Sequence, residues 1–171
     1  MRIVILGLLF LVLATITPVG SEMGIMPGEL AEIAKNENCA QLSDFYESKH
    51  GMINPPYVYG YLPGPKEKSA VFWCRNLTPG RPLYVLVFVF KQMEHELTKC
   101  PDRIEWENPP GGLSIYTDRR TTLDGFTYID NPNRPVPPKV HLKYNGVLSE
   151  NDGFEELFYC YKGKWLVKQL D

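Results

Sequence analysis

Residues 157–170 have the sequence LFYCYKGKWLVKQL, in which two runs of strand-forming residues flank the dipeptide Lys162-Gly163. A two-residue connection of this kind favours a tight hairpin, because glycine adopts the positive φ that such turns require. In this register Cys160 faces Trp165 across the two strands, and paired side chains of this size stabilise a sheet. We therefore predict that the chain ends in an antiparallel β-hairpin.

Further strand signals precede this hairpin. Residues Leu83 to Phe90 are apolar on both faces, which is typical of a central strand covered from both sides. Between 140 and 144 apolar and polar residues alternate, which indicates a half-buried strand. Proline and glycine clusters separate these segments, as expected for the loops of a β-rich domain. Additional short strands are predicted over 70–75, 103–107, 113–117 and 126–129.

The part of the chain from Pro27 to about His50 has a helical pattern. Leu30, Ile33 and Ala34 recur at helical spacing, and a similar group over 42–46 indicates a second short helix. Together with the later strands, this pattern predicts an α+β fold. In that fold, an N-terminal helical segment packs on a mainly antiparallel β-sheet within one disulfide-stabilised domain.

The first 21 residues differ from the rest of the chain. Arg2 precedes a nearly unbroken apolar run over 3–16, and small residues follow before the first acidic residue, Glu22. A basic start, a short apolar centre and small residues at the exit are typical of a secretory signal peptide. We expect a signal peptide over 1–21 and a single globular domain over 22–171, located in the periplasm or secreted. An uncleaved N-terminal anchor is the alternative, and no later segment is long enough to cross a bilayer.

Four cysteines follow the predicted signal peptide, and none belongs to a C-x-x-C pair. In an oxidising compartment an even number of cysteines favours structural disulfides over metal or redox sites. One bridge with two free thiols, or some use of cysteine in metal binding, remains the alternative. Four cysteines allow three pairings, and we favour the one that ties the helical segment and the terminal hairpin to the sheet: Cys39–Cys74 and Cys100–Cys160.

Length and charge exclude some classes of protein. The chain has 171 residues with 44% hydrophobic residues, which suits one globular domain with a substantial core. The formal net charge is −2, so there is no overall basic field to attract nucleic acid. We expect neither a nucleic-acid partner nor stable membrane insertion once the signal peptide is removed.

The sequence contains none of the familiar catalytic motifs, and this absence favours binding over catalysis. Glu105 and Glu107 share one face of a predicted strand and are the weak candidates for acid–base chemistry in a hydrolase-like enzyme. Charged residues on a strand face more often remain solvated and discourage aggregation. Met93 and His95 are weak candidates for a metal-handling site, although no established ligand spacing is present. No cofactor is expected.

Three tyrosines at alternate positions, Tyr57, Tyr59 and Tyr61, lie in a proline-rich segment. An extended backbone places all three rings on one side, and such rings offer stacking area with hydroxyl tips. The alternative is that one ring enters the core while the others cover prolines. We predict that the chain is an exported binding module for a protein or a glycan, with these tyrosines as its ligand contacts.

Overall fold

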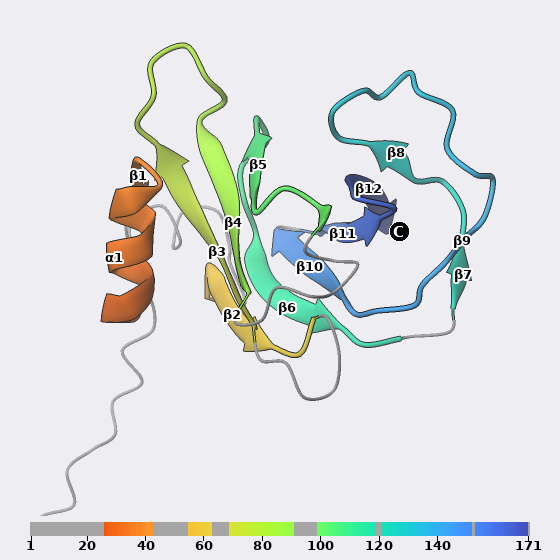
Figure 1. Ribbon diagram of the computed structural model, residues 1–171, viewed down its shortest axis with the longest axis horizontal. Coiled ribbons are helices and arrows are strands. Elements are labelled where there is room, and N and C mark those ends of the chain that lie inside the picture. The colour runs from red at the N-terminus through yellow and green to blue at the C-terminus, as the bar shows by residue number, and fades with distance from the viewer. Residues whose placement is uncertain are drawn as a thin grey trace, which may run out of the picture.

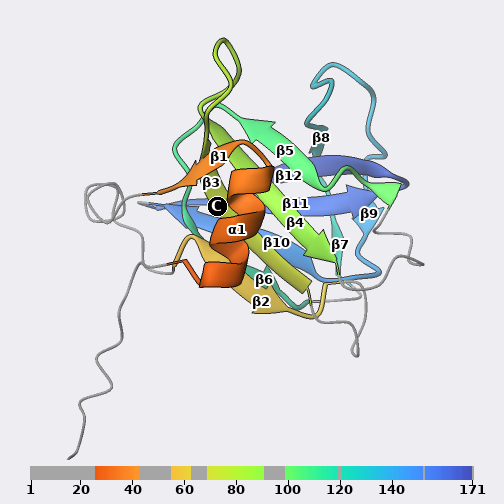
Figure 2. The ribbon, with the colours of Figure 1, turned by 60° about the vertical axis from the view of Figure 1, so that its left-hand side comes forward.

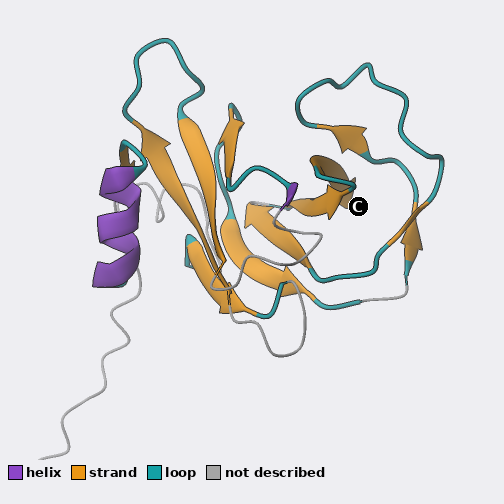
Figure 3. Ribbon diagram, viewed as in Figure 1, coloured by secondary structure: helices purple, strands orange, loops and turns teal. Residues whose placement is uncertain are grey.

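The computed structural model describes residues 26–42, 55–62, 69–90, 99–118, 121–151 and 153–170. Half of these residues lie in strands, which form two five-stranded antiparallel sheets and one small two-stranded sheet. A single helix, α1 (Gly28–Asn36), lies beside the first sheet (Figure 1). Figure 3 shows the same distribution, with α1 beside the strands.

The first sheet is built around a long hairpin of two buried strands, β3 and β4. Its strands run in the order β1-β3-β4-β5, and β2 pairs with β3 on the same side as β1. The bounds are β1 (Cys39–Gln41), β2 (Tyr57–Gly60), β3 (Ser69–Asn76), β4 (Tyr84–Phe90) and β5 (Arg103–Trp106).

The second sheet is built around the C-terminal hairpin, and its strands run in the order β6-β10-β11-β12-β8. The two remaining strands, β7 and β9, pair with each other. The bounds are β6 (Gly112–Tyr116), β7 (Thr122–Leu123), β8 (Thr127–Tyr128), β9 (Val140–His141), β10 (Gly146–Asn151), β11 (Phe154–Tyr161) and β12 (Lys164–Leu170).

The main core lies between the two large sheets. Trp73 on β3 meets Phe158 on β11 edge to face, with ring centroids 5.8 Å apart. Phe88 on β4 stacks on Trp165 of β12 at 4.1 Å. On one side the sheets are joined by a backbone hydrogen bond of 2.9 Å, which the Leu113 amide donates to the Pro55 carbonyl. The result is a sandwich whose aromatic interior excludes water and supplies much of the stabilisation.

Each sheet is also covered on its outer face. Leu30 and Ala34 of α1 pack on β3 and β4, and Figure 2 shows the helix crossing in front of these strands. Residues 121–145 arch over the second sheet on the opposite side of the molecule and cover Tyr159 and Leu166 (Figure 1). Strand β4 is therefore covered from both sides, in agreement with its two-sided apolar sequence.

The predicted α+β class is wrong, because strands dominate the described part of the chain and α1 is the one short helix there. Helix α1 ends at Asn36, and the segment that follows is a strand where the pattern predicts more helix: Asn38 adopts a left-handed conformation with φ of 54°, and β1 begins at the next residue. Cys39, Ala40 and Gln41 then pair with β3, so tertiary pairing overrides the local helical preference. The second predicted helix, over 42–46, lies outside the described residues except for Leu42, which is not helical.

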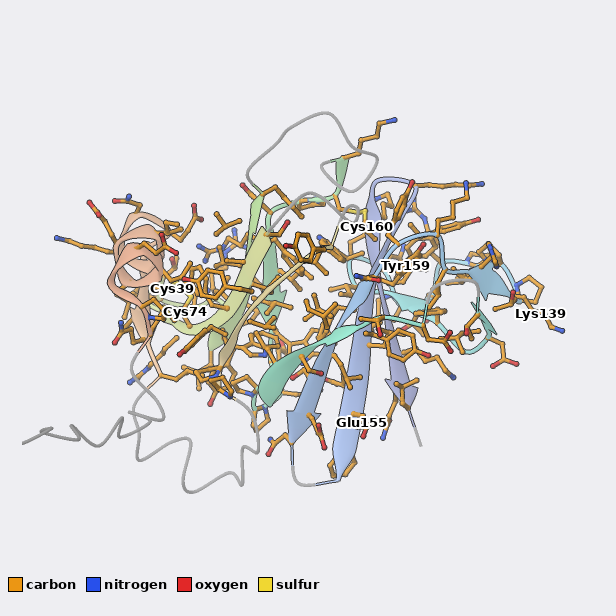
Figure 4. The ribbon with its side chains drawn as sticks, turned by 90° about the horizontal axis from the view of Figure 1, so that it is seen from below. Cys39, Cys74, Lys139, Glu155, Tyr159 and Cys160 are labelled. Carbon is orange, nitrogen blue, oxygen red and sulfur yellow. A yellow bond between two sulfur atoms is a disulfide. The ribbon has the colours of Figure 1, made fainter. Side chains whose placement is uncertain are left out.

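The C-terminal hairpin and the disulfides are confirmed. Cys160 pairs with Trp165 as predicted, and the turn residues Lys162 and Gly163 both have positive φ. The structure contains the favoured bridges, Cys39–Cys74 and Cys100–Cys160. Figure 4 shows the first bridge beneath α1 and places Cys160 on the second sheet. Among the described residues, no helix is both long enough and apolar enough to cross a membrane.

Candidate ligand-binding pocket

The inner face of the second sheet changes from apolar to polar along its length. Phe158 on β11 and Val167 on β12 belong to the central core. Two residues further along each strand, and therefore on the same face, lie Glu156 and Gln169, which are direct cross-strand partners. Ser149 on β10 faces Glu156 from the other side. The strand register thus places a carboxyl, an amide and a hydroxyl at one open end of the sandwich.

These groups line a pocket of about 460 Å³, which falls in the range of roughly 300–1,000 Å³ typical of small-ligand sites. The second sheet forms one wall, and the segment connecting β5 to β6 forms the other. The lining residues are Asn108, Pro109, Gly111, Ser149, Asn151, Phe154, Glu156 and Gln169.

A specific contact holds the connecting segment in place. The Gly111 amide donates a hydrogen bond of 3.0 Å to the Ser149 hydroxyl oxygen. The two backbones approach so closely that a Cβ atom at Gly111 would lie 2.3 Å from the Glu150 backbone. Only glycine fits this position without moving the connecting segment away from β10.

Among the described lining residues, Glu156 is the only one with a titratable side chain. Burial raises the pKa of its carboxyl, and contacts from Trp106 and Asn108 partly offset that rise. The Trp106 indole N–H faces the carboxyl without reaching full hydrogen-bond geometry. Among the described residues no cationic side chain forms an ion pair with Glu156, so the charge is compensated only by neutral donors.

Two further features point to a ligand. The Asn151 side-chain oxygen is buried and accepts no hydrogen bond within the described part of the chain, which is costly for a buried polar atom. Phe154 faces Asn151 across the β10–β11 hairpin, and 64% of its surface is exposed at the rim. A ligand that covers Phe154 would remove this exposed ring from water.

The three predicted tyrosines do not form a single exposed row. Tyr57 and Tyr59 are half-buried and pack with the cluster beneath α1. The Tyr59 hydroxyl donates a bond of 2.7 Å to Glu29 of the helix. Burial, with this bond and the negative charge of Glu29, raises the pKa of Tyr59 to about 12. Tyr61 follows the end of β2 and is the exposed member of the three. Whether they contact a ligand stays a prediction.

The weak catalytic and metal candidates do not converge with the pocket. Glu105 on β5 forms ion pairs with Arg81 at 3.5 Å and Arg103 at 3.6 Å. Glu107 lies just past the end of β5 and is exposed. Met93 and His95 fall outside the described residues. The described part of the chain holds no group of three or more metal-ligating side chains.

Sequence reasoning missed the pocket for a definable reason. The first strand of the predicted hairpin begins at Leu157, whereas β11 begins at Phe154; the second strand, Lys164–Leu170, agrees with β12. Extending the predicted register by one pair places Glu156 on the same face as Phe158. Glu156 is thus an acidic residue two positions from a buried aromatic residue. That inward-facing acid was the available signal.

Comparison with models of protein families, with curated protein sequences and with solved structures finds no match for this chain. Its function therefore has to be argued from the pocket itself.

Proposed function

We propose that this protein is an exported binding protein that takes a glycan into the pocket at the open end of the sandwich. The observation that carries the proposal is the inward-facing set of Glu156, Gln169 and Asn151, which continues the core face of the second sheet. Sequences avoid placing polar groups on a core face unless they have partners, so this set favours a ligand that supplies them.

The chemistry of the lining suits a sugar. Side-chain amides donate and accept at once, as sugar hydroxyl groups do. Asn108, Asn151 and Gln169 supply three such amides around the cavity. Phe154 adds an exposed flat ring at the rim, which suits stacking against the C–H face of a pyranose. A polar wall with one aromatic platform favours a glycan over an extended protein surface.

The number of carboxyl groups that line the pocket favours sugar binding over sugar hydrolysis. Glycoside hydrolysis ordinarily requires a pair of carboxyl groups flanking the scissile bond. Among the described residues that line the pocket, Glu156 is the only one with a carboxyl group. The pocket therefore supports recognition better than acid–base catalysis.

An exported location agrees with the two disulfides, which form and persist in oxidising compartments. We propose that residues 1–21 act as a signal peptide and that 22–171 form the single mature domain, periplasmic or secreted. Finding residues 1–21 on protein isolated from its natural source would contradict this part of the proposal.

The test is isothermal titration of the mature protein with soluble tetrasaccharides of glucose, N-acetylglucosamine and glucosamine. We expect at least one to bind, and Phe154→Ala to weaken that binding tenfold or more. Leu77→Ala is the matched control, because Leu77 is also an exposed apolar side chain (53% exposed) but lies on the β3–β4 loop. If none of the three sugars binds, or if both variants bind equally well, the proposal fails.

A further inference from the structure

The described lining of the pocket contains a carboxyl group with neutral donors beside it but no cation. The Glu156 carboxyl has no cationic partner among the described residues, and the buried Asn151 oxygen accepts no hydrogen bond there. The lining residues that the structure describes include no lysine, arginine or histidine. A site with this imbalance is better completed by a ligand that carries donors and positive charge than by one that is neutral.

We propose that the sugar bound in this pocket carries a free amino group, and that its ammonium pairs with the Glu156 carboxylate. This inference rests on the proposed glycan-binding function and names the class of sugar. The ammonium has three donors, so it can bond at once to Glu156 and to a neighbouring acceptor such as the side-chain oxygen of its cross-strand partner Gln169. The pyranose ring then lies toward the rim, where Phe154 is exposed.

The surroundings of Glu156 make this pairing effective. Its cross-strand partners are Ser149 and Gln169, both uncharged, and the contacting Trp106 and Asn108 are also uncharged. No described charged group therefore competes with the ligand for the carboxylate. Because the carboxyl is partly desolvated, an ion pair formed there is screened less by salt than one on the surface.

An N-acetylated sugar is the matched comparison, since acetylation keeps the ring and removes the charge and two of the donors. The experiment titrates mature protein with tetramers of glucosamine and of N-acetylglucosamine at pH 7 in 0.5 M NaCl. Glucosamine partly deprotonates near neutral pH, so the measurement is repeated at pH 6, where the amine is more fully charged. High salt suppresses non-specific attraction of a cationic oligomer to this acidic chain.

We expect the glucosamine tetramer to bind at least tenfold more tightly than its N-acetylated form. Glu156→Gln should abolish that preference, so that the two tetramers bind this variant with similar affinity. Glu155→Gln is the matched control: Glu155 is the neighbouring residue on β11, faces the opposite side of the sheet and does not line the pocket. Figure 4 shows Glu155 near the end of this strand. Glu155→Gln should keep the full preference.

Three results would overturn the inference. If the N-acetylated tetramer binds wild-type protein as tightly as the free amine does, the amino preference is absent although glycan binding stands. If Glu156→Gln keeps the preference, the ammonium does not pair with Glu156. If tetralysine competes as strongly as the glucosamine tetramer, the pocket recognises an amine without a sugar. Failure of all oligosaccharides to bind overturns the proposed function as well.

Discussion

Glu156 on β11 and Gln169 on β12 face each other across the C-terminal hairpin, and both line the same pocket. The next pair on this face, Phe158 and Val167, belongs to the core. The sheet therefore changes from hydrophobic core to polar cavity over a single step of the strand pair. A partly buried carboxylate in this position lowers the free energy of unfolding, and a substitution of Glu156 measures by how much.

Glu156→Gln should raise the free energy of unfolding at pH 7. Burial raises the pKa of Glu156 in the folded protein, so the ionised form is less favourable folded than unfolded. The gain should be less than about 1 kcal/mol, because solvent reaches the pocket and screens the charge. Urea denaturation of the variant and of Glu155→Gln measures the difference.

The raised pKa of Glu156 also predicts how the stability gained in Glu156→Gln depends on pH. Between the ordinary pKa of glutamate and the raised folded value, the unfolded chain has lost its proton while the folded chain keeps it. The stability of wild-type protein that is due to this group therefore falls as the pH rises through that window. The advantage of Glu156→Gln should shrink on acidification and vanish below pH 4. An advantage that is independent of pH would contradict the assignment.

Tyr59→Phe should lower the free energy of unfolding by about 1 kcal/mol, because it removes the hydrogen bond to Glu29 that ties β2 to α1. The pKa of Tyr59 is raised to about 12, above the unfolded value of 10.0. This stabilisation should be complete below pH 10 and disappear as the pH rises toward 12. Tyr57→Phe is the control, because the Tyr57 hydroxyl has no hydrogen bond within the described residues. Equal unfolding curves for the two variants would show that the bond contributes nothing.

The elements that could be predicted from sequence are those whose local pattern agrees with their tertiary environment. The terminal hairpin has a turn that permits one register, and β4 is apolar on both faces because both faces are covered. The disulfide pairing could be predicted because each bridge ties a peripheral segment, the N-terminal helical segment or the terminal hairpin, to the rest of the fold.

The elements that could not be predicted are those whose environment overrides the local pattern. Strand β1 has three residues and is held by its pairing with β3 and by the Cys39–Cys74 bridge. Strand β10 was not expected because Ser149 and Asn151 occupy the face that would carry apolar residues in an ordinary core strand. The pocket was missed for that same reason: the residues that form it are the ones that break the strand pattern.

Replacing both Cys100 and Cys160 by alanine should lower the free energy of unfolding by about 4 kcal/mol, because the bridge closes a loop with a sequence separation of 60. This bridge also joins the segment before β5 to β11 and so links the two sheets of the sandwich. Urea denaturation without reductant gives the loss. The matched control is the Cys39 and Cys74 double variant, whose bridge has a separation of 35 and fastens β1 within one sheet. A loss below 1 kcal/mol for the first variant would show that the sheets hold together without their covalent link.

Asn76 begins the triplet Asn76-Leu77-Thr78, which matches the acceptor pattern for N-glycosylation. In the fold, Asn76 is only 7% exposed, and its side-chain amide donates a bond of 3.0 Å to the Pro82 carbonyl. Its oxygen accepts from the Thr78 amide at 3.0 Å. The side chain thus shapes the β3–β4 turn and is inaccessible once that turn forms.

We therefore expect protein secreted from a eukaryotic host to carry no glycan at Asn76, as checked by intact mass before and after glycosidase treatment. Asn76→Ala should lower the free energy of unfolding by about 2 kcal/mol, because it leaves buried backbone groups without partners. Thr78→Ala, which also destroys the acceptor pattern, should cost less. A stoichiometric glycan at Asn76 would contradict the structure of this turn.

Gly111→Ala tests whether the close approach of the β5–β6 connection shapes the pocket. The added methyl group would lie 2.3 Å from the Glu150 backbone, and backbone cannot move aside as a flexible side chain can. The connection must therefore shift away from β10 and lose the hydrogen bond from Gly111 to Ser149. We expect a loss of roughly 1–3 kcal/mol in the free energy of unfolding, together with weaker binding of any sugar that binds the wild-type protein.

Gly28→Ala is the control, because a Cβ atom there meets nothing within 4 Å and alanine favours the helix that begins at this residue. Wild-type stability and binding in Gly111→Ala would mean that the connecting segment can be displaced without affecting the pocket.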